Sequence, residues 1–269
     1  MKWRILVLSA FLCLAACGDD DSDFATRPDG EESSSSDSET RVSSSSFPEG
    51  YVDSSTVVKG TMVDERDGQA YKTVVIGTQT WMAENLNYAY IGIPYNYSGN
   101  TSDSTSWCYG DNPANCTKYG RLYTWAAAMD SVGTWSANGK GCGNNKTCSP
   151  TYPVRGVCPE GWHLPTQTEW NTLFTAVGGS STAGKMLKST SGWNSSGNGT
   201  DAYAFSALPA GGRNYGGDFY GEGSNAYFWG SAVNDSYFAY GMSLYYSSDD
   251  ASLGNYGKSY GFSVRCLKD

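Results

Sequence analysis

Histidine is nearly absent from this sequence of 269 residues, in which His163 is the only one. A metal site built from several imidazoles is therefore excluded, and any histidine-dependent hydrolase chemistry would have to use His163. The paired C-x2-C knuckles of a zinc cluster are also missing. We expect neither a metal nor a cofactor.

Positive charge is scarce as well, with 18 lysines and arginines against 27 aspartates and glutamates. The formal net charge is -9, and removing residues 1–16, which include Lys2 and Arg4, lowers it to -11. Nucleic acids and anionic membrane surfaces are recognised through basic patches that replace counterions. We therefore expect no nucleic-acid partner.

No apolar run at the start of the chain is long enough to span a bilayer comfortably. Residues 1–16 have the basic start and short apolar stretch of a signal peptide. The stretch ends in Leu-Ala-Ala-Cys, which resembles the lipobox of bacterial lipoproteins, and this predicts cleavage before Cys17 and its acylation. The alternative is an ordinary secretory signal with a chance cysteine. The following Gly-Asp-Asp-Asp resembles lipoprotein surface-export signals, so we expect a lipid anchor in the bacterial outer membrane, facing the cell surface.

Residues 17–56 lack the apolar content needed for a core. They are rich in Asp, Ser, Glu, Pro and Gly, with serine tracts at 33–36 and 43–46, and this composition predicts a disordered tether. From residue 57 to residue 269 the composition changes to Gly, Tyr and Trp with little charge. This part is compatible with one domain.

Six cysteines remain once Cys13 leaves with the signal peptide and Cys17 carries lipid. An even number in an exported chain indicates disulfide bonds. Two pairs are close in sequence with turn-forming residues between them. The expected pairs are Cys108–Cys116, Cys142–Cys148 and, by remainder, Cys158–Cys266.

Alternating and turn-forming residues predict a meander of strands at 61–63, 71–76 and 80–83. Further strands are expected at 202–208, 226–233, 237–246 and 261–267. Apolar residues at i, i+3, i+4 and i+7 predict a short helix over 122–129, and another is plausible over 183–188. These elements predict an α+β domain with two main helices, a mainly antiparallel sheet and many loops.

A helix also begins near the lone histidine. Thr166 and Glu169 have the T-x-x-E spacing of a capping box, with Trp170 continuing an apolar face. His163, three residues before the cap, is expected to hold this corner by bonding to backbone. A catalytic or ligand-binding role for His163 is the alternative.

Five segments carry a family resemblance: DGQAYKTVVIGTQTWMAENLNY, YGRLYTWAAAM, GVCPEGWHLPTQTEW, FSALPAGGRN and GFSVRCLKD. In this order they resemble the Fibrobacter succinogenes major paralogous domain family over nearly all of residues 57–269. HLPTQTEW and GFSVRC are more distantly similar to formylglycine-generating-enzyme-like domains. That similarity implies a C-type-lectin-like fold whose N- and C-terminal strands meet.

Catalysis has little support in these residues. The copper-dependent oxidases of the distant relatives use two nearby C-terminal cysteines, but only Cys266 follows Cys158 here. A glycosidase needs two carboxylates, for which Glu84, Glu169, Asp201 and Asp218 are available without a recognisable setting. The triplets of calcium-dependent lectins do not occur, and oxygen-rich runs at 233–236 and 247–250 are typical of solvated turns.

A non-catalytic binding module is therefore the leading hypothesis, with polysaccharide or a surface protein as partner. Six glycines between Gly211 and Gly223 predict a long surface loop within residues 207–231. Aromatic rings with neighbouring amides and carboxylates suit sugars. The candidate ligand-binding residues are Asn214, Tyr215, Asp218, Phe219, Tyr220 and Tyr227. An envelope scaffold is the alternative function.

Overall fold

The computed structural model describes residues 49–97 and 100–269. The predicted signal peptide, the lipidation site Cys17 and all but the last residues of the predicted tether lie outside the described residues. The last part of that tether packs on the domain, because the Val52 amide donates to the Ala176 carbonyl and the Tyr203 hydroxyl donates to the Val52 carbonyl. The folded unit therefore includes residues before position 57.

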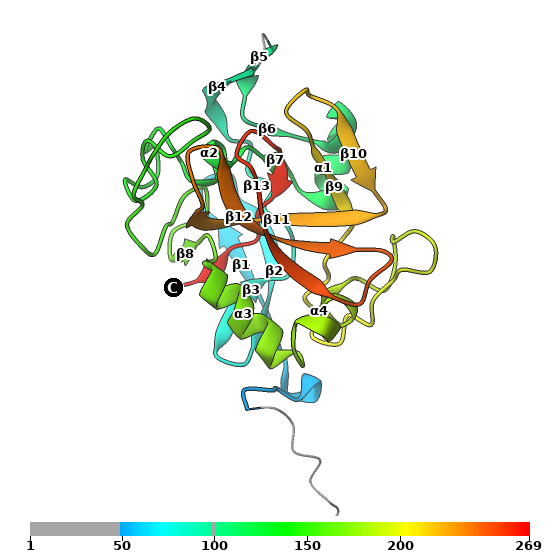
Figure 1. The fold of residues 1–269 in the computed structure, drawn as a ribbon. Helices are drawn as coiled ribbons and strands as arrows, with labels where there is room; N and C mark the ends of the chain where they lie inside the picture. Colours follow the sequence, from blue (N-terminus) through cyan, green and yellow to red (C-terminus); the bar gives the residue numbers. More distant parts are fainter. Residues whose placement is uncertain (1–48, 98–99) are drawn as a thin grey trace, which may run out of the picture. The chain divides into compact units, whose positions relative to one another are not determined.

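One sheet joins the two ends of the domain (Figure 1). All its strand pairs are antiparallel, and the C-terminal strand lies between the N-terminal meander and the strand that carries His163. This confirms the predicted meander and the expected meeting of the terminal strands. In spatial order the strands are β1 (Val58–Asp64), β2 (Gln69–Ile76), β3 (Gln79–Met82), β15 (Leu267–Lys268) and β8 (Trp162–His163).

A second, larger sheet contains most of the C-terminal half of the chain. Its strands are β6 (Ser106–Trp107), β7 (Leu122–Tyr123), β9 (Ala210–Arg213), β10 (Phe219–Glu222), β11 (Asn225–Val233), β12 (Phe238–Tyr245), β13 (Ala251–Gly257) and β14 (Phe262–Ser263). The main path runs β10-β9-β11-β14-β7-β6, and β12 and β13 extend it from β11. A separate two-stranded pair is formed by β4 (Ile91–Tyr97) and β5 (Asn100–Ser104).

The helices are all short. In the described part of the chain they are α1 (Pro113–Tyr119), α2 (Trp125–Ala128), α3 (Gln167–Ala176) and α4 (Ser180–Leu187), with 3-10 turns η1 (Ser54–Thr56) and η2 (Tyr109–Asp111). The expected capping box is confirmed, since the Thr166 hydroxyl accepts from the Glu169 amide and the Glu169 carboxylate accepts from the Thr166 amide.

The predicted α+β, C-type-lectin-like class with two main helices is wrong. Two sheets with thirteen strands between them dominate the described residues, and the fold is loop-rich and β-sandwich-like. The physical reason is that the apolar helical stripes are too brief: Leu122 of the predicted helix lies in β7, and α2 begins only after the cap at Thr124. The predicted strand at 202–208 is a turn, with Asp201, Ala204 and Ser206 at positive φ.

Two buried clusters make the core. In one, Trp81 of β3 stacks on Trp170 of α3 with ring centroids 4.6 Å apart, which fixes this helix against the first sheet. In the other, Phe262 of β14 packs between Trp229 and Tyr227 of β11, at 4.6 and 4.7 Å. Buried aromatic pairs of this kind contribute about 0.5–1.5 kcal/mol each beyond their area. Within the described ranges, no helix has the length and apolarity to cross a membrane.

Candidate functional site: a tyrosine row and a polar pocket

The segment predicted to be a long loop is a β-hairpin, so that prediction is wrong. β9 and β10 pair across a turn in which Asn214 and Asp218 bond to each other. Glycine allows this pairing, because the two strands approach so closely at Gly211 that a Cβ there would lie 2.2 Å from the Tyr220 carbonyl oxygen. Asn214 and Asp218, two of the predicted ligand-binding residues, hold the turn together.

The aromatic residues predicted to bind ligand have different environments. Phe219 packs against Tyr109, with centroids 5.3 Å apart, and Tyr227 is buried against Phe262. Tyr227 is therefore closed to a ligand, while Phe219 is half-buried. Tyr215 is 47% exposed and Tyr220 is half-buried, and both make edge contacts with Tyr260, at 6.1 and 6.5 Å.

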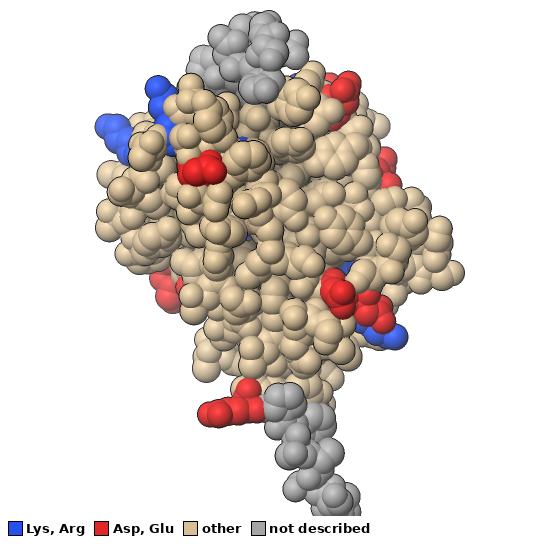
Figure 2. Space-filling model, viewed as in Figure 1, with Lys and Arg blue, Asp and Glu red and all other residues tan. Residues whose placement is uncertain are grey.

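These rings belong to a larger group that we call the tyrosine row. Neighbouring ring centroids within it are 5.7 to 6.5 Å apart, and Tyr245 and Tyr256 both contact Tyr227. On the face viewed in Figure 1, where β11–β13 cross the middle of the picture, charged side chains are few (Figure 2). The members of the row are Tyr215, Tyr260, Tyr220, Tyr227, Tyr245 and Tyr256.

The sequence did not single out Tyr245, Tyr256 and Tyr260 as site residues. β13, which carries Tyr256, was not predicted, and only the pairing of β11, β12 and β13 brings Tyr245 and Tyr256 beside Tyr227. Tyr260, after β13, contacts Tyr215 and Tyr220. Burial raises the pKa of Tyr256 to about 12, and it raises the pKa of Tyr220 further. At neutral pH these hydroxyls are protonated and can donate hydrogen bonds.

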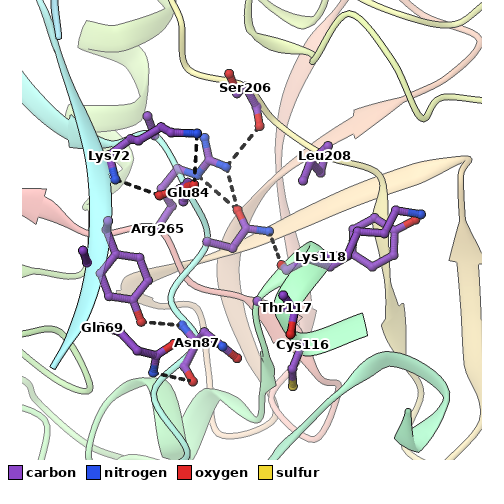
Figure 3. A pocket seen from close by; sticks show the side chains of 16 residues that line it. Gln69, Lys72, Glu84, Asn87, Cys116, Thr117, Lys118, Ser206, Leu208 and Arg265 are labelled. Carbon is purple, nitrogen blue, oxygen red and sulfur yellow. Dashed lines mark hydrogen bonds and ion pairs between the residues drawn. The ribbon is translucent and has the colours of Figure 1, made fainter. Parts of the chain in front are cut away.

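A polar pocket of 280 Å3 lies between β2, the segment after β3, and α1 (Figure 3). Four of the segments that carry the family resemblance supply its walls. Its side-chain lining includes the amides of Gln69, Asn85 and Asn87, the charged groups of Lys72, Glu84, Lys118 and Arg265, and the hydroxyls of Thr117 and Ser206.

Arg265 forms part of the pocket wall although it is fully buried. Its Nε and Nη2 donate to Asn85 Oδ1 at 3.2 and 2.7 Å, Nη1 donates to the Phe205 carbonyl, and the guanidinium lies 4.3 Å from the Phe205 ring centroid. Burial lowers the pKa of Arg265 to about 9. The sequence signal for this residue is a lone arginine in the apolar closing segment GFSVRC, and that pattern alone does not place it at a pocket.

His163 links three parts of the chain. Nδ1 lies 2.6 Å from Asp269 Oδ1, and Nε2 lies 3.0 Å from Oε1 of Glu169, the capping-box glutamate. The imidazole therefore bonds to two carboxylates instead of the expected backbone. Burial of the imidazole lowers its pKa, but the hydrogen bonds and charges of Glu169 and Asp269 outweigh burial, so the pKa of His163 is raised.

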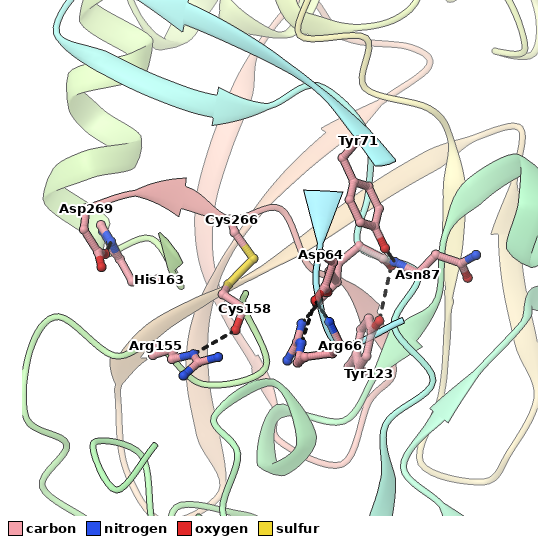
Figure 4. The surroundings of a disulfide bond; sticks show 11 residues. Asp64, Arg66, Tyr71, Asn87, Tyr123, Arg155, Cys158, His163, Cys266 and Asp269 are labelled. Atoms are coloured by element: carbon pink, nitrogen blue, oxygen red, sulfur yellow. Dashed lines mark hydrogen bonds and ion pairs between the residues drawn. A yellow bond between two sulfur atoms is a disulfide. The ribbon is translucent and has the colours of Figure 1, made fainter. Parts of the chain in front are cut away.

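The three predicted disulfide bonds are all present in the structure. Cys108–Cys116 and Cys142–Cys148 close short loops, and Cys158–Cys266 spans 108 positions. Figure 4 shows that Cys158–Cys266 joins the segment before β8 to the segment before β15. The long bond therefore fastens the strand that carries His163 beside the one that ends at Asp269.

The carboxylates considered for glycoside hydrolysis all have structural partners. Glu169 serves the capping box and His163, Asp201 accepts from the amide and hydroxyl of Ser206, and Glu84 accepts from the Lys72 amide. Asp218 belongs to the hairpin turn described above. Across residues 49–97 and 100–269, no cluster of three His, Cys, Asp or Glu is arranged to hold a metal ion.

Residues 74–268 match the sequence model of a family described as the Fibrobacter succinogenes major domain. The match covers well over half of the chain, and the chain belongs to this family. No curated protein and no solved structure shows significant similarity to it.

Proposed function

We propose that this protein is a surface-anchored, non-catalytic module that binds extracellular or plant cell-wall polysaccharide. Cys17 carries the lipid, the outer membrane holds the anchor, and residues 17–48 keep the domain clear of the surface. The observation that supports binding is the tyrosine row, in particular Tyr215 and Tyr220 beside Tyr260.

Tyrosine suits this role because one side chain offers both an apolar face and a hydroxyl. The apolar face packs against the C–H groups of a sugar ring, and the hydroxyl bonds to sugar hydroxyls. Rings already packed against one another lose little conformational freedom when a ligand binds. Exposed Tyr215 and half-buried Tyr220 and Tyr260 form the ligand contact, while buried Tyr227 supports them.

The experiment is a pull-down of the purified protein on plant cell-wall fractions and insoluble polysaccharides. Wild type should be retained, and Tyr215→Ala and Tyr220→Ala should each weaken retention. Tyr237→Ala is the matched control because Tyr237 is exposed to a similar extent, 52% against 47%, but lies in the β11–β12 turn outside the row. Melting temperatures of all variants show whether they are folded.

Retention that is equal in wild type and both folded row variants would place the site elsewhere. If wild type binds no polysaccharide, the envelope scaffold or protein-interaction role becomes the better account.

A further inference from the structure

Cationic side chains gather at the polar pocket of a chain that is acidic overall. Three of the 18 lysines and arginines line it, namely Lys72, Lys118 and Arg265, against one lining carboxylate, Glu84. Figure 3 shows Lys72 and Glu84 near Arg265 on one side of the pocket and Lys118 across it. The charged groups that line the pocket are therefore mainly positive, whereas the chain as a whole is negative.

Arg265 is the cation without a direct counter-charge. Its hydrogen-bond partners are the neutral oxygens of Asn85, Phe205 and Ser206, and it forms no ion pair within the described residues. Asp201 and Glu84 act on it through their charges, but neither is hydrogen-bonded to the guanidinium, since Asp201 is bonded to Ser206 and Glu84 pairs with Lys72. Burying a charge without an opposite charge is costly, and an anion in the pocket would reduce that cost.

The two lysines are accessible to a ligand. Lys72 is 75% exposed with Nζ 3.5 Å from Glu84, and Lys118 is 55% exposed with Nζ 4.0 Å from Glu222. Exposed pairs of this kind contribute little to stability. Each ammonium can therefore turn to a ligand at small cost.

The pocket also has groups suited to hydroxyls. The backbone amide of Asn87 donates to the Tyr71 hydroxyl and its side-chain amide donates to Gln69, yet within the described residues its buried Oδ1 has no hydrogen-bond partner. A buried acceptor without a partner is destabilising. A hydroxyl donor would satisfy it, and Gln69 and Thr117 line the same pocket.

We infer that the polar pocket binds the carboxylate and neighbouring hydroxyls of an acidic sugar, so that the polysaccharide recognised by this module contains uronic acid. This inference rests on the proposed function in taking the ligand to be a glycan. Lys72 pairs with Glu84, Lys118 pairs with Glu222, and Arg265 feels the charges of Asp201 and Glu84, but among the groups that line the pocket three cations face one carboxylate. A carboxylate can accept charge-assisted bonds from Lys72 and Lys118, and the hydroxyls beside it on a sugar ring suit the amides of Gln69 and Asn87.

The test is calorimetric titration of the full chain with oligogalacturonate, a neutral cello-oligosaccharide of equal length and inorganic phosphate. Oligogalacturonate should bind, and added salt should weaken it because the contacts are charged. Lys72→Gln and Lys118→Gln should each weaken binding by roughly two- to fivefold. Arg265 is left unchanged because its loss would disturb the fold.

Two further variants make the test specific. Lys185→Gln is the matched control, since Lys185 is an exposed lysine, 51%, with a carboxylate at 3.7 Å but lies outside the pocket lining; its binding should equal wild type. Glu84→Gln should strengthen oligogalacturonate binding by roughly two- to fivefold, because it removes the charge that competes for Lys72. If the pocket bound neutral sugars, Glu84→Gln would instead remove one hydrogen-bond acceptor and should not strengthen binding.

The outcomes separate this inference from the proposed function. Binding of the neutral oligosaccharide alone, or oligogalacturonate binding unaffected by the pocket variants, would overturn the inference and leave the polysaccharide module standing. Phosphate binding that depends on Lys72 and Lys118, without oligogalacturonate binding, would also overturn it. If Tyr215→Ala abolished oligogalacturonate binding while the pocket variants bound like wild type, recognition would lie at the tyrosine row and the inference would be overturned.

Discussion

His163 Nε2 lies 3.0 Å from Oε1 of Glu169, and the other oxygen of that carboxylate accepts from the Thr166 amide at 2.7 Å. One carboxylate thus completes a helix cap and holds the single imidazole of the chain. Burial raises the pKa of Glu169, but bonds from His163 and Thr166 outweigh it, so its pKa is lowered overall. The pKa of His163 is raised because its bonds to the carboxylates of Glu169 and Asp269 stabilise the protonated imidazole more than burial destabilises it.

These shifts predict how stability depends on pH. The His163 contribution is fully present below the ordinary pKa of 6.5 and is lost as pH rises through its higher folded value. The Glu169 contribution is present above the ordinary 4.5 and is lost as pH falls through its lower folded value. The melting temperature should therefore be highest between about pH 4.5 and pH 6.5. In His163→Gln, the melting temperature should fall less steeply as the pH rises above this range. An unchanged alkaline slope in that variant would contradict this account.

The capping box gives a second prediction. Thr166→Ala should lower the free energy of unfolding by about 1 kcal/mol, because the Glu169 amide loses its acceptor. Thr172→Ala is the control, since the Thr172 hydroxyl bonds only to the Thr168 carbonyl on the exposed side of the same helix. Denaturant unfolding of both variants measures the difference, and equal stability would show that the cap contributes nothing.

The disulfide bonds should differ in their effect on stability. In the chain-entropy model, loss of Cys158–Cys266 costs about 4–5 kcal/mol, whereas loss of Cys142–Cys148 costs about 2 kcal/mol because its loop is short. Paired Cys→Ser variants compared by denaturant unfolding test this order. Non-reducing peptide mapping that finds free thiols at Cys158 and Cys266 would refute the long bond.

The proposed lipidation of Cys17 gives a prediction that does not depend on the fold. Cys17→Ser should abolish incorporation of a labelled acyl chain and release the protein from the membrane fraction, because several acyl chains anchor far more strongly than one or none. Labelling that persists in this variant would exclude the proposed anchor.

Local sequence signals predicted the local structure well. The β1–β3 meander follows from alternation and turn residues, and α3 follows from Thr166 and Glu169. The disulfide pairs follow from spacing and elimination. Each of these depends on residues that are close in sequence or on a simple count.

The remaining features depend on contacts that no local pattern contains. The predicted strand at 261–267 is divided, with β14 in one sheet and β15 in the other. Strands of two residues show no alternation, so the larger sheet was predicted only in part. The tyrosine row and the position of Arg265 both arise from that sheet arrangement.

The central claim is that the tyrosine row binds polysaccharide, and a glycan array probed with wild type, Tyr215→Ala and Tyr220→Ala tests it most directly. The account predicts that wild type binds a defined set of plant cell-wall glycans and that both variants, with melting temperatures preserved, lose most of that signal. Tyr237→Ala should match wild type. Equal glycan signals from wild type and both folded row variants would contradict the claim.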